Sequence, residues 1–204
     1  MFAKPPDMFD RDEEWAALSR FVADDRPGAT LGVVSGRRRQ GKTFLLDALC
    51  KADNGFFFEA TEAADAESLR RIGAQLGAFS EAAVPLRPAD WREVLDALLA
   101  LGRDRPVVVA IDEFPYLARG NPELPSVVQA AFGPRREERL RSQTRLLLCG
   151  SAMSFMGRLL SGTAPLRGRA GLEIIVPTLD YQLAAQFWEI DDPQLAVLLY
   201  SIVG

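Results

Sequence analysis

The sequence lacks histidine altogether and has only two cysteines among its 204 residues. Without histidine, His-dependent acid–base catalysis and His-containing metal sites are excluded. Cys50 and Cys149 have neither pairing nor metal-ligand spacing, so we expect two buried, reduced thiols. No apolar run approaches the roughly 18 residues that a membrane span needs, and the N-terminus does not resemble a signal peptide. We therefore expect a cytoplasmic protein with no membrane partner.

The remaining composition is that of an ordinary globular protein, with 48% hydrophobic and 25% charged residues. A chain of this length can bury a large core and is expected to form one α/β domain. The net charge of −4 argues against wholesale electrostatic binding of nucleic acid, although a local basic cluster remains compatible with it.

One stretch organises the chain, with an apolar run before it at 31–35 and a helix-forming run after it at 44–51. It matches the phosphate-binding pattern G-x-x-x-x-G-K-[ST] and consists of Gly36-Arg37-Arg38-Arg39-Gln40-Gly41-Lys42-Thr43. The two glycines allow a tight loop whose N–H groups point at phosphate oxygens. The helix that opens at Lys42 adds its partly positive N-terminus at the same point.

The last two residues of this loop each have an expected ligand. Lys42 should reach the β- and γ-phosphates of ATP, and the Thr43 hydroxyl should ligate Mg²⁺. The following Phe44 is included among the expected nucleotide contacts. The alternative is a glycine-punctuated basic turn on the surface, but the flanking strand and helix favour nucleotide binding.

Strands and helices are expected to alternate along the chain. Buried strands are predicted at 29–35, 56–58, 107–111, 144–149 and 172–176. Helices are predicted at 9–24 with Asp10 as N-cap, 44–51, 60–79 with interruptions near Gly73 and Gly77, 91–101 capped by Asp90, 126–132, 152–160, 180–188 and 193–203. This alternation indicates an α/β fold with a mostly parallel sheet covered on both faces.

Two acids follow the predicted strand at 107–111. Asp112 is expected to hold Mg²⁺ through its water shell, and Glu113 could polarise the water that attacks the γ-phosphate. Acids at strand ends also serve simply as solvated loop residues. Their position after a phosphate-binding loop and one intervening strand–helix segment favours the metal and base roles.

Two further candidates follow later strands. Ser151 could contact the γ-phosphate or the attacking water, or it could cap the helix that follows it, and both roles are compatible. Arg169 could reach the γ-phosphate of its own chain or of a neighbour and stabilise the transition-state charge. For Arg169, spacing alone favours a solvated surface charge, since the chain is rich in arginine.

The chain resembles the prokaryotic and archaeal ATPase family of the AAA+/STAND-like P-loop group. Five family motifs occur in order: F-V-x-R-E-x-E-L, G-x-R-R-x-G-K-T, h-D-E-h-x-x-L, G-S and S-P-L-x-G-R, at residues 8–15, 36–43, 111–117, 150–151 and 164–169. Departures at Asp12, Trp15 and Ala164 touch no phosphate contact. The resemblance implies a five-stranded parallel sheet of the ASCE type, sandwiched by helices.

The resemblance also assigns roles. It implies that Phe9 and Arg11 lie against the nucleotide base, and that Arg169 is an arginine sensor or finger. It divides the chain into an extended lead-in at 1–8, an ATPase core at 9–179 and the start of a helical lid at 180–204. A missing C-terminal domain is expected, because the family's next segment would begin where the chain ends. ATP is expected over GTP, since no N-K-x-D motif is present.

The leading functional prediction is an Mg²⁺-dependent ATP hydrolase whose cycle moves attached domains. The alternatives are a slow regulatory switch that retains ATP or ADP, and a DNA-associated ATPase subunit. The charged run at 135–141 could touch phosphates, but its interleaved acids favour a solvated helix face. A small-molecule kinase is disfavoured, and a homo-oligomer or protein partner remains open.

Overall fold

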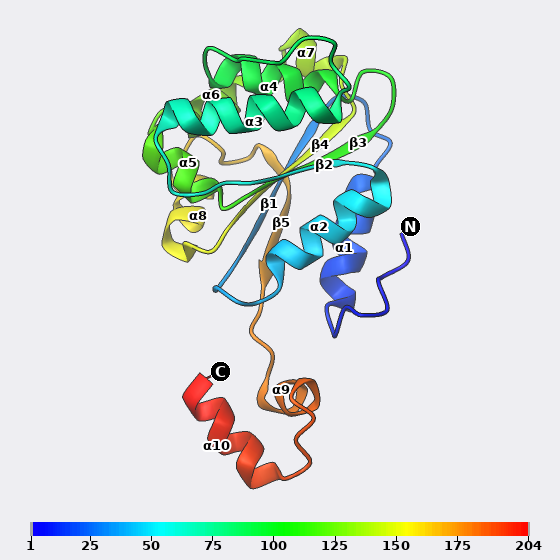
Figure 1. Ribbon diagram of the computed structural model, residues 1–204, viewed down its shortest axis with the longest axis vertical. Coiled ribbons are helices and arrows are strands. Elements are labelled where there is room, and N and C mark those ends of the chain that lie inside the picture. Colours follow the sequence, from blue (N-terminus) through cyan, green and yellow to red (C-terminus); the bar gives the residue numbers. More distant parts are fainter. Residues whose placement is uncertain (1, 204) are drawn as a thin grey trace.

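The computed structural model describes residues 2–203 and contains one sheet of five strands in the order β2-β3-β4-β1-β5 (Figure 1). The strands are β1 (Thr30–Gly36), β2 (Phe56–Glu59), β3 (Val107–Asp112), β4 (Thr144–Gly150) and β5 (Ala170–Val176). Every neighbouring pair is parallel, so the predicted five-stranded α/β sheet is confirmed. β4 lies between β1 and β3.

Helices cover both faces of this sheet (Figure 1). One face packs against α1 (Asp12–Val22) and α2 (Lys42–Asp53). The other face packs against α3 (Asp65–Phe79), α4 (Trp91–Ala100), α5 (Phe114–Gly120), α6 (Leu124–Ala131) and α8 (Met153–Leu160). The short α7 (Glu137–Leu140) packs against α4 and buries none of its own residues.

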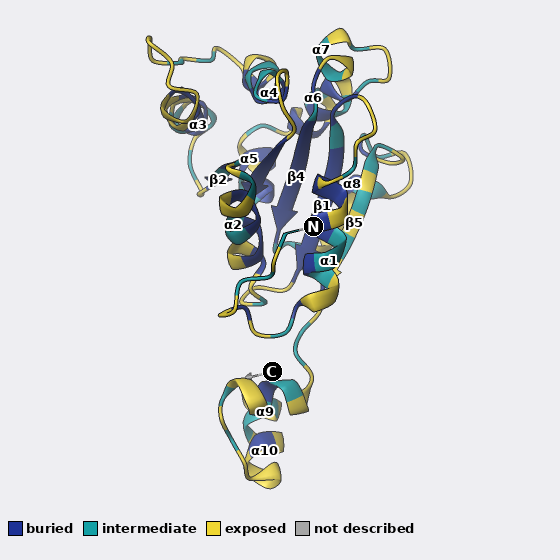
Figure 2. Ribbon diagram, turned by 90° about the vertical axis from the view of Figure 1, so that its right-hand side faces the viewer, coloured by how far each residue is buried: buried dark blue, intermediate teal, exposed yellow. Residues whose placement is uncertain are grey.

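The central strands are buried along their whole length (Figure 2). This burial explains why β3 and β4 read as nearly continuous apolar runs, because helices cover both of their faces. β5 is an edge strand in which exposed residues alternate with more covered ones. Cys50 and Cys149 are both free and buried, as expected, and burial raises the pKa of the Cys50 thiol to about 12.

The first helix begins later than its sequence pattern predicts. α1 starts at Asp12, and its N-cap is Arg11 with φ at 70°, so the expected cap by Asp10 is wrong. The lead-in is not fully extended either, because the Met8 N–H donates to the Pro5 carbonyl and closes a turn. The main chain therefore bends sharply twice before α1 begins.

The third helix differs from its prediction in two ways. α3 begins at Asp65 rather than at 60, and it runs through Gly73 and Gly77 without interruption. A Cβ at Gly73 would lie 2.5 Å from the Pro88 ring. This glycine therefore makes room for the segment before α4 instead of breaking α3.

A helix also lies between the strand predicted at 107–111 and the helix predicted at 126–132, where the sequence pattern indicates only a loop. α5 follows Glu113 directly and contains Pro115 in its first turn. Proline is well tolerated there, because the N–H it lacks would have no intrahelical partner. In contrast, the predicted cap of α4 is confirmed, since Asp90 Oδ1 accepts from the Arg92 and Glu93 N–H groups at 2.8 and 3.0 Å.

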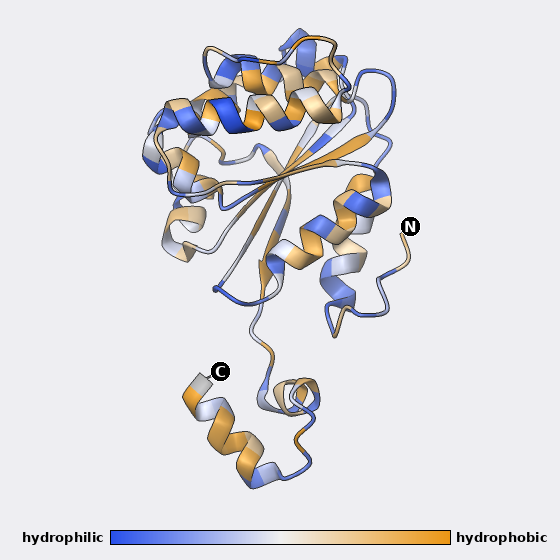
Figure 3. Ribbon diagram, in the orientation of Figure 1, coloured by the Kyte–Doolittle hydropathy of each residue, from blue (hydrophilic) through white to orange (hydrophobic). Residues whose placement is uncertain are grey.

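The last two helices, α9 (Tyr181–Phe187) and α10 (Pro193–Val203), extend away from the end of β5 (Figure 1). Both expected helices are present, although Met1 and Gly204, the outer ends of the expected lead-in and lid regions, lie outside the described residues. α10 is strongly apolar (Figure 3). Within residues 2–203, no helix is both long and apolar enough to cross a membrane.

Candidate nucleotide-binding site

The phosphate loop, residues 36–43, connects β1 to α2. Gly41 is the N-cap of α2 with φ at 77°, a left-handed conformation that favours glycine. At Gly36 a Cβ would lie 2.7 Å from the Val176 carbonyl of β5, so the close approach of two strands requires glycine. The loop therefore has the backbone shape that the sequence pattern predicts.

The two polar side chains that open α2 both point into this loop region. Lys42 is 5% exposed, and its Nζ donates to the Arg37 carbonyl across the loop at 2.7 Å. The Thr43 hydroxyl donates to Asp112 Oδ2 at 2.6 Å. The end of β3 therefore lies next to the start of α2. The sequence motifs suggested this proximity but could not establish the contact.

The contact between Thr43 and Asp112 provides a test of whether Mg²⁺ fits. Mg²⁺ prefers oxygen ligands and usually keeps several waters while binding one or two protein groups and substrate phosphates. A hydroxyl and a carboxylate side by side, beside a loop of phosphate-binding shape, supply such a set. The residues present fit the ion.

Glu113 lies beside this pair in an unusual backbone conformation. Its φ of 50° is left-handed, which costs of the order of 1 kcal/mol or more for a residue with a side chain. Its carboxylate accepts from the Ser151 hydroxyl, with Oε1 at 3.0 Å and Oε2 at 3.2 Å. Ser151 does not cap α8, whose N-cap is Ala152, so the capping alternative is wrong.

The arginines of the phosphate loop are exposed, and only one has a described side-chain partner. Arg38 donates to the Tyr116 hydroxyl at 3.2 Å, which links the loop to α5. Sequence reasoning missed this contact because it expected a loop where α5 lies. Arg37, Arg39 and the half-buried Gln40 lie beside the two small cavities described next.

A cavity of about 250 Å³ lies between the lead-in, the phosphate loop and α9. Its lining includes Phe9, Arg11 and Phe44, which are three of the expected nucleotide contacts. Phe187 also lines it and stacks at an angle on Phe9, with ring centroids 5.5 Å apart. Sequence reasoning missed Phe187, although an aromatic residue in a helix next to the core was the available signal.

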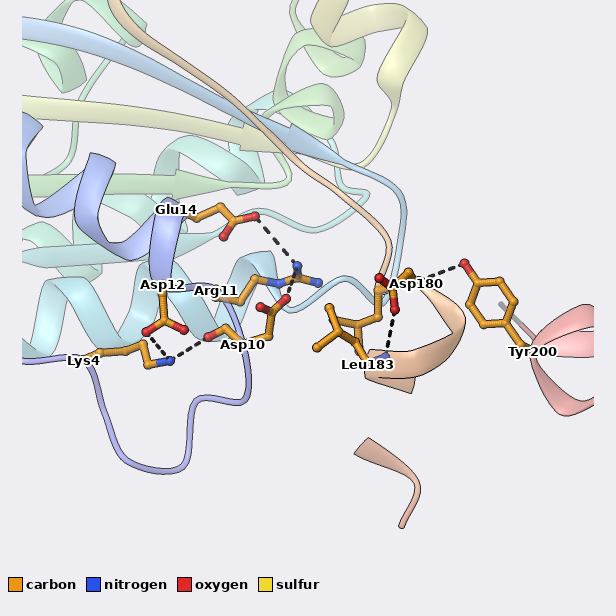
Figure 4. Close-up of polar contacts among 9 residues, drawn as sticks. Lys4, Asp10, Arg11, Asp12, Glu14, Asp180, Leu183 and Tyr200 are labelled. Carbon is orange, nitrogen blue, oxygen red and sulfur yellow. Dashed lines mark hydrogen bonds and ion pairs between the residues drawn. The ribbon is translucent and has the colours of Figure 1, made fainter. Parts of the chain in front are cut away.

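Arg11 is held by its acidic neighbours (Figure 4). Its Nη1 lies 3.2 Å from Asp10 Oδ2 and 3.8 Å from Glu14 Oε1. The sharp left-handed bend at residues 10 and 11 places the guanidinium between these two carboxylates. Arg11 thus fixes the wall of the cavity.

A second cavity, of about 260 Å³, separates the phosphate loop from α9 and α10. The arginines at 37–39 form one side, and Thr178, Trp188 and Tyr200 contribute to the other. The Tyr200 hydroxyl also donates to the Leu179 carbonyl at 2.9 Å (Figure 4). α10 is therefore fastened to the segment that leaves β5 beside the phosphate loop.

Arg169 is not brought to this site. It precedes β5, and the pair Leu31–Ala170 lies at the end of the sheet opposite the pair Gly36–Val176. Six residues of strand separate the two ends, roughly 20 Å at about 3.3 Å per residue, which exceeds the length of an arginine side chain. The register contradicts the alternative in which Arg169 acts on its own chain's nucleotide. Action on a neighbouring chain stays a prediction.

The largest cavity described lies elsewhere, between α1 and β5, with about 690 Å³. Four carboxylates, Asp12, Glu13, Glu14 and Glu173, line it together with Arg20. Such a lining repels phosphate. The phosphate loop, and not this groove, is therefore the candidate nucleotide site.

Comparison with solved structures identifies the fold. The Walker-type ATPase PABY2304 of Pyrococcus abyssi matches with a TM-score of 0.65 and 22% identity, over 94% of this chain and 62% of that chain. The fold is that of an archaeal P-loop ATPase. The ORC2 protein of Aeropyrum pernix, solved with ADPNP and ADP, has this fold too, with a TM-score of 0.64 and 17% identity over 92% of this chain and 52% of its own. Cdc6p from Pyrobaculum aerophilum matches with a TM-score of 0.60 and 16% identity, over 91% of this chain and 51% of its own.

In sequence, the chain is 27% identical over 180 residues to an uncharacterised protein of Methanocaldococcus jannaschii. That match covers 88% of this chain and 38% of the Methanocaldococcus protein. No family model matches the chain. The chain thus spans less than two thirds of the length of each of these proteins. The P-loop ATPase fold that the sequence resemblance implied is confirmed.

Proposed function

We propose that this chain is the Mg²⁺-dependent ATP-binding and ATP-hydrolysing part of a protein whose cycle moves attached domains. One observation carries the proposal. Two hydrogen-bonded pairs, Thr43 with Asp112 and Ser151 with Glu113, lie beside Lys42 at one edge of the sheet. Removal of a γ-phosphate needs these groups together: a phosphate-binding cation, a metal-binding pair and a carboxylate base.

Each side chain then has a distinct task. Lys42 would exchange the Arg37 carbonyl for phosphate oxygens of ATP. Mg²⁺, held through Thr43 and Asp112, would neutralise charge on the β- and γ-phosphates. Glu113 would accept the proton of the attacking water.

The cavities beside the phosphate loop support a base site and a coupling route. The aromatic cavity formed by Phe9 and Phe187 offers ring surfaces on which an adenine could stack. The second cavity brings α9 and α10 next to the loop arginines. A change in phosphate occupancy would alter the charge that these helices face, and so shift their position.

A slow nucleotide switch is the second candidate, and the contact of Ser151 with both Glu113 oxygens favours it. A carboxylate held by a hydroxyl is less available to orient a water. A DNA-associated role has no comparable support, because Arg136 and Arg141 of the charged run pair with Glu138 and Glu137 at 3.1 and 2.6 Å. These ion pairs interrupt the run, so it does not form a continuous basic face.

The deciding experiment uses the purified chain with a slight deficit of Mg-ATP. Free nucleotide is removed, and the bound and released nucleotides are identified over time. We expect ATP to be converted to ADP, and we expect EDTA to stop the conversion. Retention of unchanged ATP would favour the switch, and absence of bound nucleotide would contradict both candidates.

Replacing Ser151 with alanine tests whether its hydroxyl positions Glu113. We expect kcat to change roughly fivefold to tenfold, the effect of one hydrogen bond of about 1 kcal/mol, while the Kd for ATP stays the same. A fall would indicate that the hydroxyl orients the base, and a rise that it restrains the base as a switch would. Ser151→Thr should restore the wild-type kcat, and the matched control is Ser154→Ala, since Ser154 is an exposed serine of α8. An unchanged kcat would contradict a positioning role.

Replacing Phe9 with alanine tests the base cavity. We expect the Kd for ATP and ADP to rise roughly tenfold, because stacking of one base on an aromatic ring is worth about 1–3 kcal/mol. Binding of pyrophosphate, which has no base, should not change. Phe79 is an equally exposed phenylalanine (37% for both) that also pairs with another ring, so Phe79→Ala is the control. Equal losses for pyrophosphate and ATP would place the effect outside base recognition.

We also propose that Arg169 acts on the nucleotide of a neighbouring copy. Arg169 lies at the end of the sheet opposite its own phosphate loop. The strand end that carries Arg169 in one copy would therefore have to pack against the phosphate-loop end of the other copy. The measurement is specific activity against protein concentration. A rise with concentration that Arg169→Ala abolishes would support the proposal, and a constant specific activity would contradict it.

A further inference from the structure

α7 lies at the end of the sheet opposite the phosphate loop (Figure 1). A cavity of about 290 Å³ is lined there by Arg139 of α7 and by the residues at the start of β1 and β5. The residues that begin β1 and β5 form its floor, and the segment 132–139 forms one wall. Three arginines, Arg26, Arg139 and Arg169, line it, and none of its lining residues is acidic. We call it the arginine cavity.

Two of these three guanidinium groups have no acidic partner among residues 2–203. Arg26 is paired, since its Nε donates to Asp24 Oδ2 at 2.7 Å. For Arg139 and Arg169 the described part of the chain provides no carboxylate within ion-pair distance, although both are half-buried. The acids nearest to Arg139 in the sequence, Glu137 and Glu138, form ion pairs with Arg141 and Arg136 instead. The cavity therefore carries uncompensated positive charge.

A fourth guanidinium lies beneath the floor. Arg145 of β4 is completely buried and donates to the Gly28 and Arg26 carbonyls at 3.0 and 3.2 Å, and also to the Asp24 carbonyl. Burial lowers the pKa of Arg145, Asp24 opposes that shift, and the nearby charge of Arg26 adds to it. These contacts hold the loop before β1 in place and add to the positive potential at the cavity.

Thr30, at the start of β1, carries an unsatisfied hydroxyl. Thr30 lines the cavity and lies next to Arg145 in the strand register. Its Oγ1 is buried and has no hydrogen-bond partner in residues 2–203. A buried donor left unpaired is unfavourable, and an acceptor within its reach would remove this penalty.

We propose that the arginine cavity binds a small phosphate-bearing anion, at a second site independent of the phosphate loop. Guanidinium groups match the oxygen spacing of phosphate with paired hydrogen bonds, and Thr30 would supply a further donor. The volume of about 290 Å³ lies just below the roughly 300 to 1,000 Å³ of drug-sized ligand cavities, which suits a small anion. A nucleic acid would need a continuous basic face, whereas ion pairs neutralise Arg136 and Arg141 next to the cavity.

The test uses inorganic pyrophosphate as the probe and the Lys42→Ala chain, so that the phosphate loop does not contribute. We expect calorimetry to find one remaining site in this background. Adding Arg139→Gln should weaken it by about tenfold or more, as expected for a lost charge-assisted hydrogen bond. Thr30→Val, which keeps the side-chain shape, should weaken it severalfold.

Arg103 is exposed at the same edge of the sheet and does not line the cavity, so Arg103→Gln is the matched control and should have no effect. Arg139→Lys should retain part of the affinity. Absence of a site in the Lys42→Ala chain would overturn the proposal, and so would equal losses from Arg103→Gln and Arg139→Gln. Arg139-dependent binding of a short DNA duplex without a pyrophosphate site would assign the cavity to nucleic acid instead.

Discussion

Replacing Glu113 with glutamine should produce a chain that binds Mg-ATP and does not hydrolyse it. Glutamine keeps the size of the side chain and can still accept from the Ser151 hydroxyl, so the hydrogen bond seen at 3.0 Å is preserved. It cannot accept a proton from water. We expect kcat to fall on the order of a hundredfold to a thousandfold, within the range for loss of a general base.

The measurement is the identity of the nucleotide bound after single turnover, wild type beside variant. Wild type should yield ADP, and Glu113→Gln should retain ATP with a Kd close to that of wild type. Glu59 provides a matched control, because it pairs with Asp112 in the strand register and is exposed at the same edge of the sheet. Glu59→Gln should hydrolyse ATP normally. Hydrolysis by Glu113→Gln at the wild-type rate would show that another group activates the water.

This prediction also explains the backbone at Glu113. A non-glycine residue at φ of 50° is costly, and such residues are concentrated where function requires a particular side-chain direction. The conformation turns the chain from β3 directly into α5. It also directs the carboxylate toward Ser151 at the end of the neighbouring strand. Relaxing this bend would separate the Glu113 carboxylate from the Ser151 hydroxyl.

Most of the fold could be predicted from the sequence because strong local patterns agreed with tertiary demands. β3 and β4 are apolar throughout and lie where both faces are covered. The departures occur where local rules compete with packing. At Gly73, a residue that weakens helices is retained because Pro88 passes within 2.5 Å of its would-be Cβ. At α1, the chain bends at Asp10 and Arg11, so the expected capping residue lies before the helix and cannot serve it.

The candidate site was predictable only as far as its residues belong to short motifs. The phosphate loop and the acids after β3 lie at fixed spacings, and the parallel sheet brings their strand ends together. Phe187 belongs to no motif and reaches the site through long-range packing. Tyr116 lies at an unspecified position of the 111–117 motif, and its contact with Arg38 depends on α5, which the sequence pattern did not predict. The location of Arg169 followed from the predicted parallel sheet, because a residue before a strand and a residue after a parallel strand lie at opposite ends of the sheet. The prediction that Arg169 acts on its own chain's nucleotide overlooked this constraint.

Replacing Lys42 with alanine should weaken ATP binding on the order of a hundredfold, because the charge-assisted bonds to phosphate are worth about 3 kcal/mol. Lys42 is buried, and its only described partner is the Arg37 carbonyl of its own loop, so its ammonium can pass to a ligand without breaking an ion pair. Lys51 lies on the same helix, is exposed and pairs with Asp47 at 2.6 Å, which makes Lys51→Ala the matched control. Thermal unfolding of both variants should establish that each is folded, and calorimetric titration with Mg-ATP gives the affinities. If Lys42→Ala binds Mg-ATP as tightly as Lys51→Ala does, the phosphate loop is not the nucleotide site, and the roles proposed for Thr43 and Asp112 fail with it.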